Sequence, residues 1–103
     1  MINNNSPRLS LYYTNACSLQ RKRRRLNQEA RGAKILSVTE SWYKNSQSQE
    51  DREIEGYAPP LTNNRPGDRN GGGVALYYKP DIIVKRLPEY EEDGLELLWA
   101  KIK

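Results

Sequence analysis

Two polar side chains stand at the ends of short apolar runs, where they could do chemistry. Glu40 follows the run 35–39, and Asn15 ends the run that begins at Leu9. In open α/β sheets, ligands and metals are held at the carboxyl ends of strands. Carboxylate and amide oxygens are the donors that a hard cation such as Mg²⁺ prefers. The pattern predicts a divalent-metal and phosphate site with Asn15 and Glu40 in it. A solvated strand-end acid and a turn asparagine are the alternatives.

The segments around these residues predict how the chain positions them. Residues 9–14 and 35–40 are typical of strands, and 18–31 contains strong helix formers without Pro or Gly. We expect Ser18 to cap the helix and Gly32 to end it. Strand, helix and strand at this spacing predict parallel strands with a right-handed crossover, which brings Asn15 and Glu40 to one sheet edge. The predicted buried stripe of the helix consists of Leu19, Leu26 and Ala30.

The second half of the chain predicts an antiparallel meander after a loop-rich segment, 44–72. Its strands are expected at 73–79, 82–87 and 95–102. Turns are expected at Pro80-Asp81 and Asp93-Gly94. The predicted fold class is therefore α/β, a βαβ unit followed by an antiparallel meander.

Other side chains are assigned to the core or to a tail. Residues 1–8 are expected to be a disordered tail, and Cys17 a small buried residue. The aromatic residues expected in the core are Trp42, Tyr57, Tyr77, Tyr78 and Trp99.

Composition limits the class of protein. The chain has 103 residues, 36% of them apolar and none of them Phe, which suits one small domain with a thin core. Its mean hydropathy is −0.95. The absence of His excludes a His-ligated metal or a His general base within these residues. A single Cys excludes an internal disulfide, and no apolar run could span a bilayer. We expect an intracellular, nuclear location.

The net charge of +4 is unevenly distributed. Basic residues concentrate in 21–34 and acidic residues in 89–96. This separation favours a polyanionic partner, most simply nucleic acid. For Arg21–Arg25 the alternatives are a solvated helix face, nuclear targeting or nucleic-acid contact. For Arg65, Arg69 and Gly71–Gly73 they are a flexible loop or a backbone and arginine contact to DNA phosphates.

Four segments together resemble a known family. They are Thr14-Asn-Ala-Cys-Ser-Leu19, Ser37-Val-Thr-Glu-Ser-Trp42, Gly56-Tyr57 and Gly71-Gly-Gly-Val-Ala-Leu-Tyr-Tyr-Lys79, followed by a strand-like Leu95–Ile102. Their order resembles the endonuclease/exonuclease/phosphatase superfamily. It is most similar to the apurinic-endonuclease-like domain that precedes reverse transcriptase in LINE-type (non-long-terminal-repeat) retrotransposons. The resemblance covers 9–103.

The resemblance implies a fold, a chemistry and a partner. It implies the N-terminal part of a two-sheet α/β sandwich that nicks DNA by magnesium-dependent phosphodiester hydrolysis. Glu40 matches the family's magnesium-ligand glutamate, and Asn15 the asparagine that helps bind metal and phosphate. The family's Gly-Asp-x-Asn and Ser-Asp-His segments do not occur in the 103 residues. We therefore expect these residues alone to be inactive. The alternative is a non-catalytic, basic nucleic-acid-binding remnant or a relic.

Overall fold

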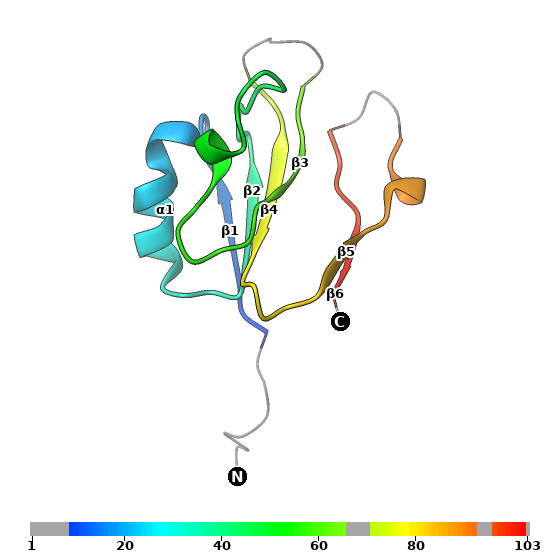
Figure 1. Cartoon of the computed structure of the whole chain (residues 1–103). Coiled ribbons are helices and arrows are strands. Elements are labelled where there is room, and N and C mark those ends of the chain that lie inside the picture. The colour runs from blue at the N-terminus through cyan, green and yellow to red at the C-terminus, as the bar shows by residue number, and fades with distance from the viewer. Residues whose placement is uncertain (1–8, 66–70, 93–95, 103) are drawn as a thin grey trace.

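Two parallel strands and the helix between them form the N-terminal half of the fold (Figure 1). The structure is a computed structural model that describes residues 9–65, 71–92 and 96–102. Strand β1 (Leu11–Asn15) pairs in parallel with β2 (Ile35–Thr39). Between them lie a 3-10 turn, η1 (Gln20–Lys22), and helix α1 (Arg23–Ala30). The predicted βαβ unit is confirmed.

The helix begins later than the sequence predicts. Ser18 is not its N-cap, because it has a left-handed φ of 85° and its N–H donates to the Glu40 carbonyl at 3.0 Å. The chain enters α1 through η1, with no side-chain cap at Lys22. The helix ends at Ala30, after which Arg31 and Gly32 have φ values of 51° and 76°, so Gly32 does allow the stop. The predicted buried stripe of Leu19, Leu26 and Ala30 is confirmed.

The predicted three-stranded meander forms only in its last two strands, which pair antiparallel, whereas its first strand pairs elsewhere. Strand β4 (Val74–Tyr78) lies between β2 and a short strand β3 (Leu61–Asn63), antiparallel to both, in the sheet order β1-β2-β4-β3. Because β3 and β2 occupy both edges of β4, the chain turns away at Pro80. Strands β5 (Val84–Arg86) and β6 (Ala100–Ile102) pair antiparallel in a second sheet. Two further 3-10 turns are η2 (Glu50–Arg52) and η3 (Pro88–Tyr90).

One face of the larger sheet and α1 enclose the core. Side chains alternate along β2, and the register pairs Leu36 with Tyr77 and Val38 with Ala75 on the buried face. Tyr57 and Tyr77 are buried, as predicted. Trp42 and Trp99, in contrast, are 37% and 51% exposed. Trp99 instead contacts the Tyr90 ring, with centroids 5.8 Å apart.

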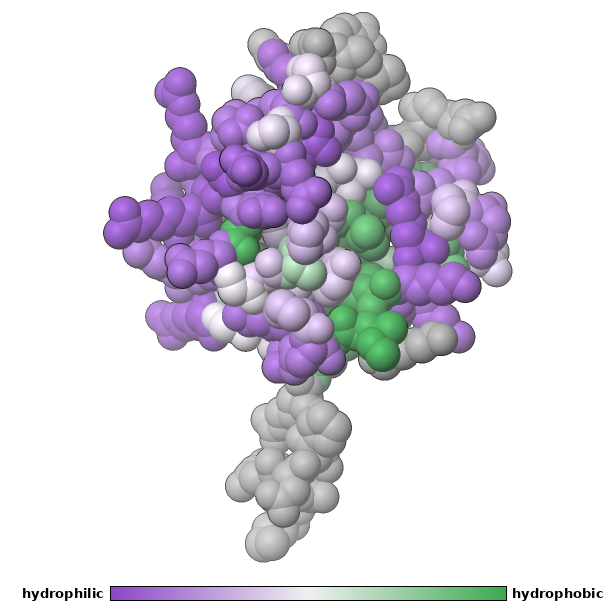
Figure 2. All heavy atoms as spheres, viewed as in Figure 1, coloured by the Kyte–Doolittle hydropathy of each residue, from purple (hydrophilic) through white to green (hydrophobic). Residues whose placement is uncertain are grey.

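The second face of the larger sheet is only partly covered. In Figure 1, α1 lies on one side of this sheet and the β5–β6 pair on the other. A groove of about 490 Å³ separates this face from the segment that contains β6. Leu11 and Tyr13, on the same face, are 64% and 58% exposed. Figure 2 shows an apolar patch on the side where β5 and β6 lie.

The described residues thus form a mixed α/β fold of six strands in two sheets and one short helix. No helix within those ranges is long and apolar enough to cross a bilayer. Three predictions concern residues outside them: the tail at 1–8, the turn at Asp93-Gly94 and the phosphate contact of Arg69.

Candidate metal and phosphate site

Asn15 and Glu40 lie at the same edge of the larger sheet. The β1–β2 register pairs Asn15 with Thr39, so Glu40 follows directly at the carboxyl end. Beyond the strands, the Ala16 N–H donates to the Thr39 carbonyl at 2.9 Å. The parallel pairing therefore brings the two predicted residues to one place, as the βαβ pattern predicts.

The Glu40 backbone adopts a conformation that is uncommon for a residue with a side chain. Its φ is 53°, and that of Trp42 is 59°. Such left-handed residues cost on the order of 1 kcal/mol each and persist where surrounding contacts fix them. The Ser18 N–H donates to the Glu40 carbonyl. The N–H groups of Ser41 and Trp42, which follow Glu40, donate to the carbonyls of Gly73 and Gly72 respectively. The peptide that carries Glu40 is therefore held from two sides.

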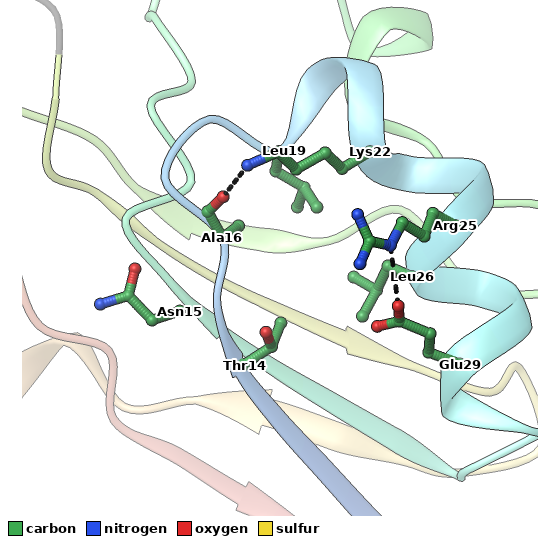
Figure 3. Close-up of a pocket in the computed structure, with 8 residues that line it drawn as sticks. All are labelled: Thr14, Asn15, Ala16, Leu19, Lys22, Arg25, Leu26 and Glu29. Carbon is green, nitrogen blue, oxygen red and sulfur yellow. Dashed lines mark hydrogen bonds and ion pairs between the residues drawn. The ribbon is translucent and has the colours of Figure 1, made fainter.

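The Glu40 carboxylate is half-buried, and no hydrogen bond or ion pair engages it among the described residues. The Asn15 side chain is exposed and lies on the opposite side of β1 from Thr14 and α1 (Figure 3). Its Oδ1 accepts a hydrogen bond from the Cys17 thiol at 3.3 Å. Cys17 is exposed, so the prediction of a buried cysteine is wrong. Its backbone is left-handed, with a φ of 46°.

These donors suit a hard cation. A carboxylate and an amide oxygen are ligands that Mg²⁺ accepts, and Mg²⁺ usually keeps several waters besides one or two protein carboxylates. Within the described ranges, no three His, Cys, Asp or Glu side chains gather in a way that could hold a metal. Glu40 and Asn15 would therefore form a shallow, weak magnesium site that leaves most positions to water and to a phosphate.

A glycine turn adjoins this edge. Gly71, Gly72 and Gly73 all have positive φ, of 90°, 66° and 84°. The Gly73 N–H donates to Oε1 of Glu96 at 2.8 Å, and Nε of Arg65 lies 3.5 Å from the same oxygen. Arg65, predicted as a phosphate contact, thus binds an anionic oxygen supplied by this chain.

The residues beneath the turn include polar atoms without partners. Ser41 is 1% exposed, and its Oγ has no hydrogen-bond partner among the described residues. Asn64 is 8% exposed, and its Oδ1 also lacks a hydrogen-bond partner there. A Cβ added to Gly73 would lie 2.8 Å from the Ser41 Oγ. The glycine is therefore required both by its φ and by the close approach of Ser41.

Sequence reasoning missed Ser41 and Glu96 as neighbours of the site. Ser41 follows Glu40 directly, but nothing in the sequence around this small side chain indicates that it is buried beside the glycine turn. Glu96 belongs to the acidic run at 89–96, which indicated only a charged loop. Its place beside Gly73 depends on the path of β5 and β6, which the meander prediction had wrong.

The basic run at 21–25 is largely engaged in contacts within the fold. Lys22 Nζ donates to the Ala16 and Cys17 carbonyls at 2.6 and 3.2 Å. Arg23 Nη1 donates to the Glu50 and Glu53 carbonyls at 3.1 and 2.6 Å. Arg25 pairs with Glu29 at 2.8 Å. Of the five, only Arg21 and Arg24 lack such a contact among the described residues.

A small pocket of about 160 Å³ lies between β1 and α1 (Figure 3). Arg25 and Tyr12 donate to the Glu29 carboxylate at its wall, and these hydrogen bonds, the one from Arg25 first, lower the Glu29 pKa. Asn15 borders the pocket with its side chain directed away from it. The pocket therefore lies on the side of β1 that faces α1, away from the Asn15 side chain (Figure 3).

No protein-family model, curated protein or solved structure matches this chain. The family resemblance rests on the sequence motifs alone.

Proposed function

We propose that the chain carries the N-terminal, metal-binding part of a magnesium-dependent DNA endonuclease of the retrotransposon type. The observation that carries the proposal is the shared edge of Asn15 and Glu40, together with a Glu40 carboxylate that has no partner among the described residues. The half-covered second face of the larger sheet is consistent with one half of a two-sheet sandwich.

The proposed roles follow from the chemistry of the donors. Glu40 would hold Mg²⁺ through its carboxylate, and Asn15 would help to place the metal and the scissile phosphate. When bound, the metal would supply charge stabilisation at the phosphate. A His general base, worth about 10²–10⁴-fold, has no counterpart among these residues, because the chain contains no His. The 103 residues alone should therefore bind rather than cleave.

A plasmid-nicking assay in Mg²⁺ tests this function. The 103-residue chain should not nick supercoiled DNA above the buffer blank. The chain extended by whatever coding sequence follows Lys103 in the transcript should nick it. Glu40→Gln should reduce that rate by about 10²-fold or more, because loss of even a group that only orients a metal ligand costs about 10–100-fold. Full activity of Glu40→Gln would contradict the proposal, and so would a stop codon directly after Lys103.

The alternative is a non-catalytic nucleic-acid-binding protein that uses the basic run. Since three of the five basic side chains bind groups of this chain, such binding would depend on Arg21 and Arg24. Binding that needs no magnesium and disappears on substitution of both residues would favour this alternative.

A further inference from the structure

We propose that Arg65 and the Gly73 backbone N–H form a phosphodiester-binding site that the Glu96 carboxylate occupies in this structure. The inference deepens the proposed function, since it gives the nucleic-acid backbone a contact beside Glu40. Its test needs neither metal nor cleavage, so it can fail independently.

The first support is the chemistry of the contact. One Glu96 oxygen accepts from the Gly73 N–H at 2.8 Å and lies 3.5 Å from Arg65 Nε. A backbone N–H and a guanidinium converging on one anionic oxygen are the groups that proteins use for phosphate oxygens. In the structure these two groups thus contact one oxygen of a carboxylate.

The second support is the space above the glycines. A Cβ on Gly72 would lie 2.0 Å from the bound Glu96 oxygen and 2.8 Å from Arg65 Nε. A Cβ on Gly71 would lie 2.9 Å from Arg65 Nη1. Only glycine lets an anion and a guanidinium approach the backbone this closely. The three glycines therefore leave room at the backbone for the anion and the guanidinium.

The third support is the location. The Gly72 and Gly73 carbonyls accept hydrogen bonds from Trp42 and Ser41, at 2.9 and 3.3 Å. These residues follow Glu40 directly, so the glycine turn is fixed to the peptide that carries the candidate metal ligand. A phosphate bound there would lie next to the candidate metal edge.

Another anion can replace Glu96 in this contact because both side chains of the ion pair are partly exposed. The Arg65 and Glu96 side chains are 37% and 29% exposed, so solvent reaches the ion pair. Ion pairs of this kind contribute little to stability. A nucleic-acid phosphate could therefore compete with Glu96, and Glu96 would act as an internal competitor that limits binding.

Fluorescence anisotropy of a labelled oligonucleotide in EDTA tests the inference. If Glu96 occupies the site about nine-tenths of the time, Glu96→Ala should tighten binding about tenfold. Glu96→Gln, which keeps an acceptor for the Gly73 N–H, should give a smaller gain. Adding Arg65→Gln to Glu96→Ala should abolish the gain. Duplex DNA, single-stranded DNA and RNA probes of equal length identify which backbone binds best.

The matched control is Glu92→Ala, which removes the same charge from an exposed residue of the same acidic run. A Glu96→Ala gain no larger than that of Glu92→Ala would overturn the inference, as would a gain that survives Arg65→Gln. If Glu96→Ala does not fold, NMR titration of the unmodified chain with inorganic phosphate decides. The Gly73 amide and the Arg65 Nε–H should shift, and shifts elsewhere alone would contradict the inference.

Discussion

The hydroxyl oxygens of Tyr43 and Tyr77 lie 2.6 Å apart in the core. The Tyr77 hydroxyl donates to the Arg52 carbonyl, which leaves its oxygen to accept from Tyr43; the Tyr43 hydroxyl also lies 3.5 Å from that carbonyl. The two side chains are 2% and 0% exposed. This pair connects β4 to the last residue of η2 and to the loop that follows Glu40.

The direction of the donors predicts unequal effects of two conservative substitutions. Tyr77→Phe removes both the donor to the Arg52 carbonyl and the acceptor for Tyr43, leaving only the long 3.5 Å hydrogen bond from the Tyr43 hydroxyl to that carbonyl. It should lower the free energy of unfolding by about 2–3 kcal/mol. Tyr43→Phe leaves the Tyr77 bond to Arg52 in place and should cost about 1 kcal/mol. Urea denaturation measures both, and a larger loss in Tyr43→Phe would contradict the assigned donor order.

The same pair predicts a loss of stability in alkali. Burial, and then the proximity of Tyr43, raise the pKa of Tyr77 far above its ordinary value near 10. A raised folded-state pKa leaves stability intact below about pH 10 and removes it as pH rises further, because only the unfolded chain ionises. Each such tyrosine should contribute a slope of about −1.4 kcal/mol per pH unit. Between pH 10 and 11.5, Tyr77→Phe should show a slope shallower by that amount, and an unchanged slope would refute it.

Arg23 should stabilise the fold, whereas its neighbour Arg24 should not. Arg23 links α1 to η2 through two backbone carbonyls, while Arg24 is exposed and makes no such contact within the part of the chain that the structure describes. Arg23→Gln should cost about 1 kcal/mol, allowing for solvent screening. Arg24→Gln, which changes the net charge equally, should stay within about 0.5 kcal/mol. Equal effects of the two substitutions in chemical denaturation would show that charge, and not the contact, is responsible.

Arg86 and Glu91 should make the attachment of the second sheet sensitive to acid. Two hydrogen bonds from Arg86, at 3.0 and 2.8 Å, lower the pKa of Glu91, and Arg86 also binds the Thr62 carbonyl in β3. A lowered folded-state pKa gives stability that is present above about pH 4.5 and is lost as pH falls through the folded-state pKa.

The thermal midpoint should therefore fall between pH 5 and 3, and Glu91→Gln should flatten that decline. Glu89→Gln is the control, because its exposed carboxylate makes no contact among the described residues. If both variants show the decline of the unmodified chain, the ion pair does not contribute.

The local signals in the sequence predicted the βαβ unit well. The apolar runs that end at Asn15 and Thr39 and the helix formers between them all favour the same local structure. The parallel register then follows from chain length and handedness. The juxtaposition of Asn15 and Glu40 could be predicted because it depends on that unit alone.

The long-range pairings could not be predicted in the same way. Strand β3 has three residues in a Pro- and Asn-rich segment, with no alternation long enough to detect. Its pairing with β4 excludes β5 from that edge. The contact of Glu96 with Gly73 depends on this arrangement. Local sequence patterns therefore predict neither the β3–β4 pairing nor the Glu96 contact. Trp42 has a left-handed backbone, with a φ of 59°, and is partly exposed. Hydrophobic periodicity in the sequence carries no signal for such a backbone conformation.

The central claim is that Glu40 and Asn15 bind a divalent cation at the shared strand edge. Mn²⁺, added as a paramagnetic substitute for Mg²⁺, should broaden NMR signals around Glu40 and the Asn15 side-chain amide first, because broadening depends on distance from the ion. Glu40→Gln should abolish this broadening. Glu55→Gln should not, because Glu55 is an exposed acid beside Asn27 of α1. Broadening centred on the acidic run at 89–92, or unchanged in Glu40→Gln, would contradict the claim.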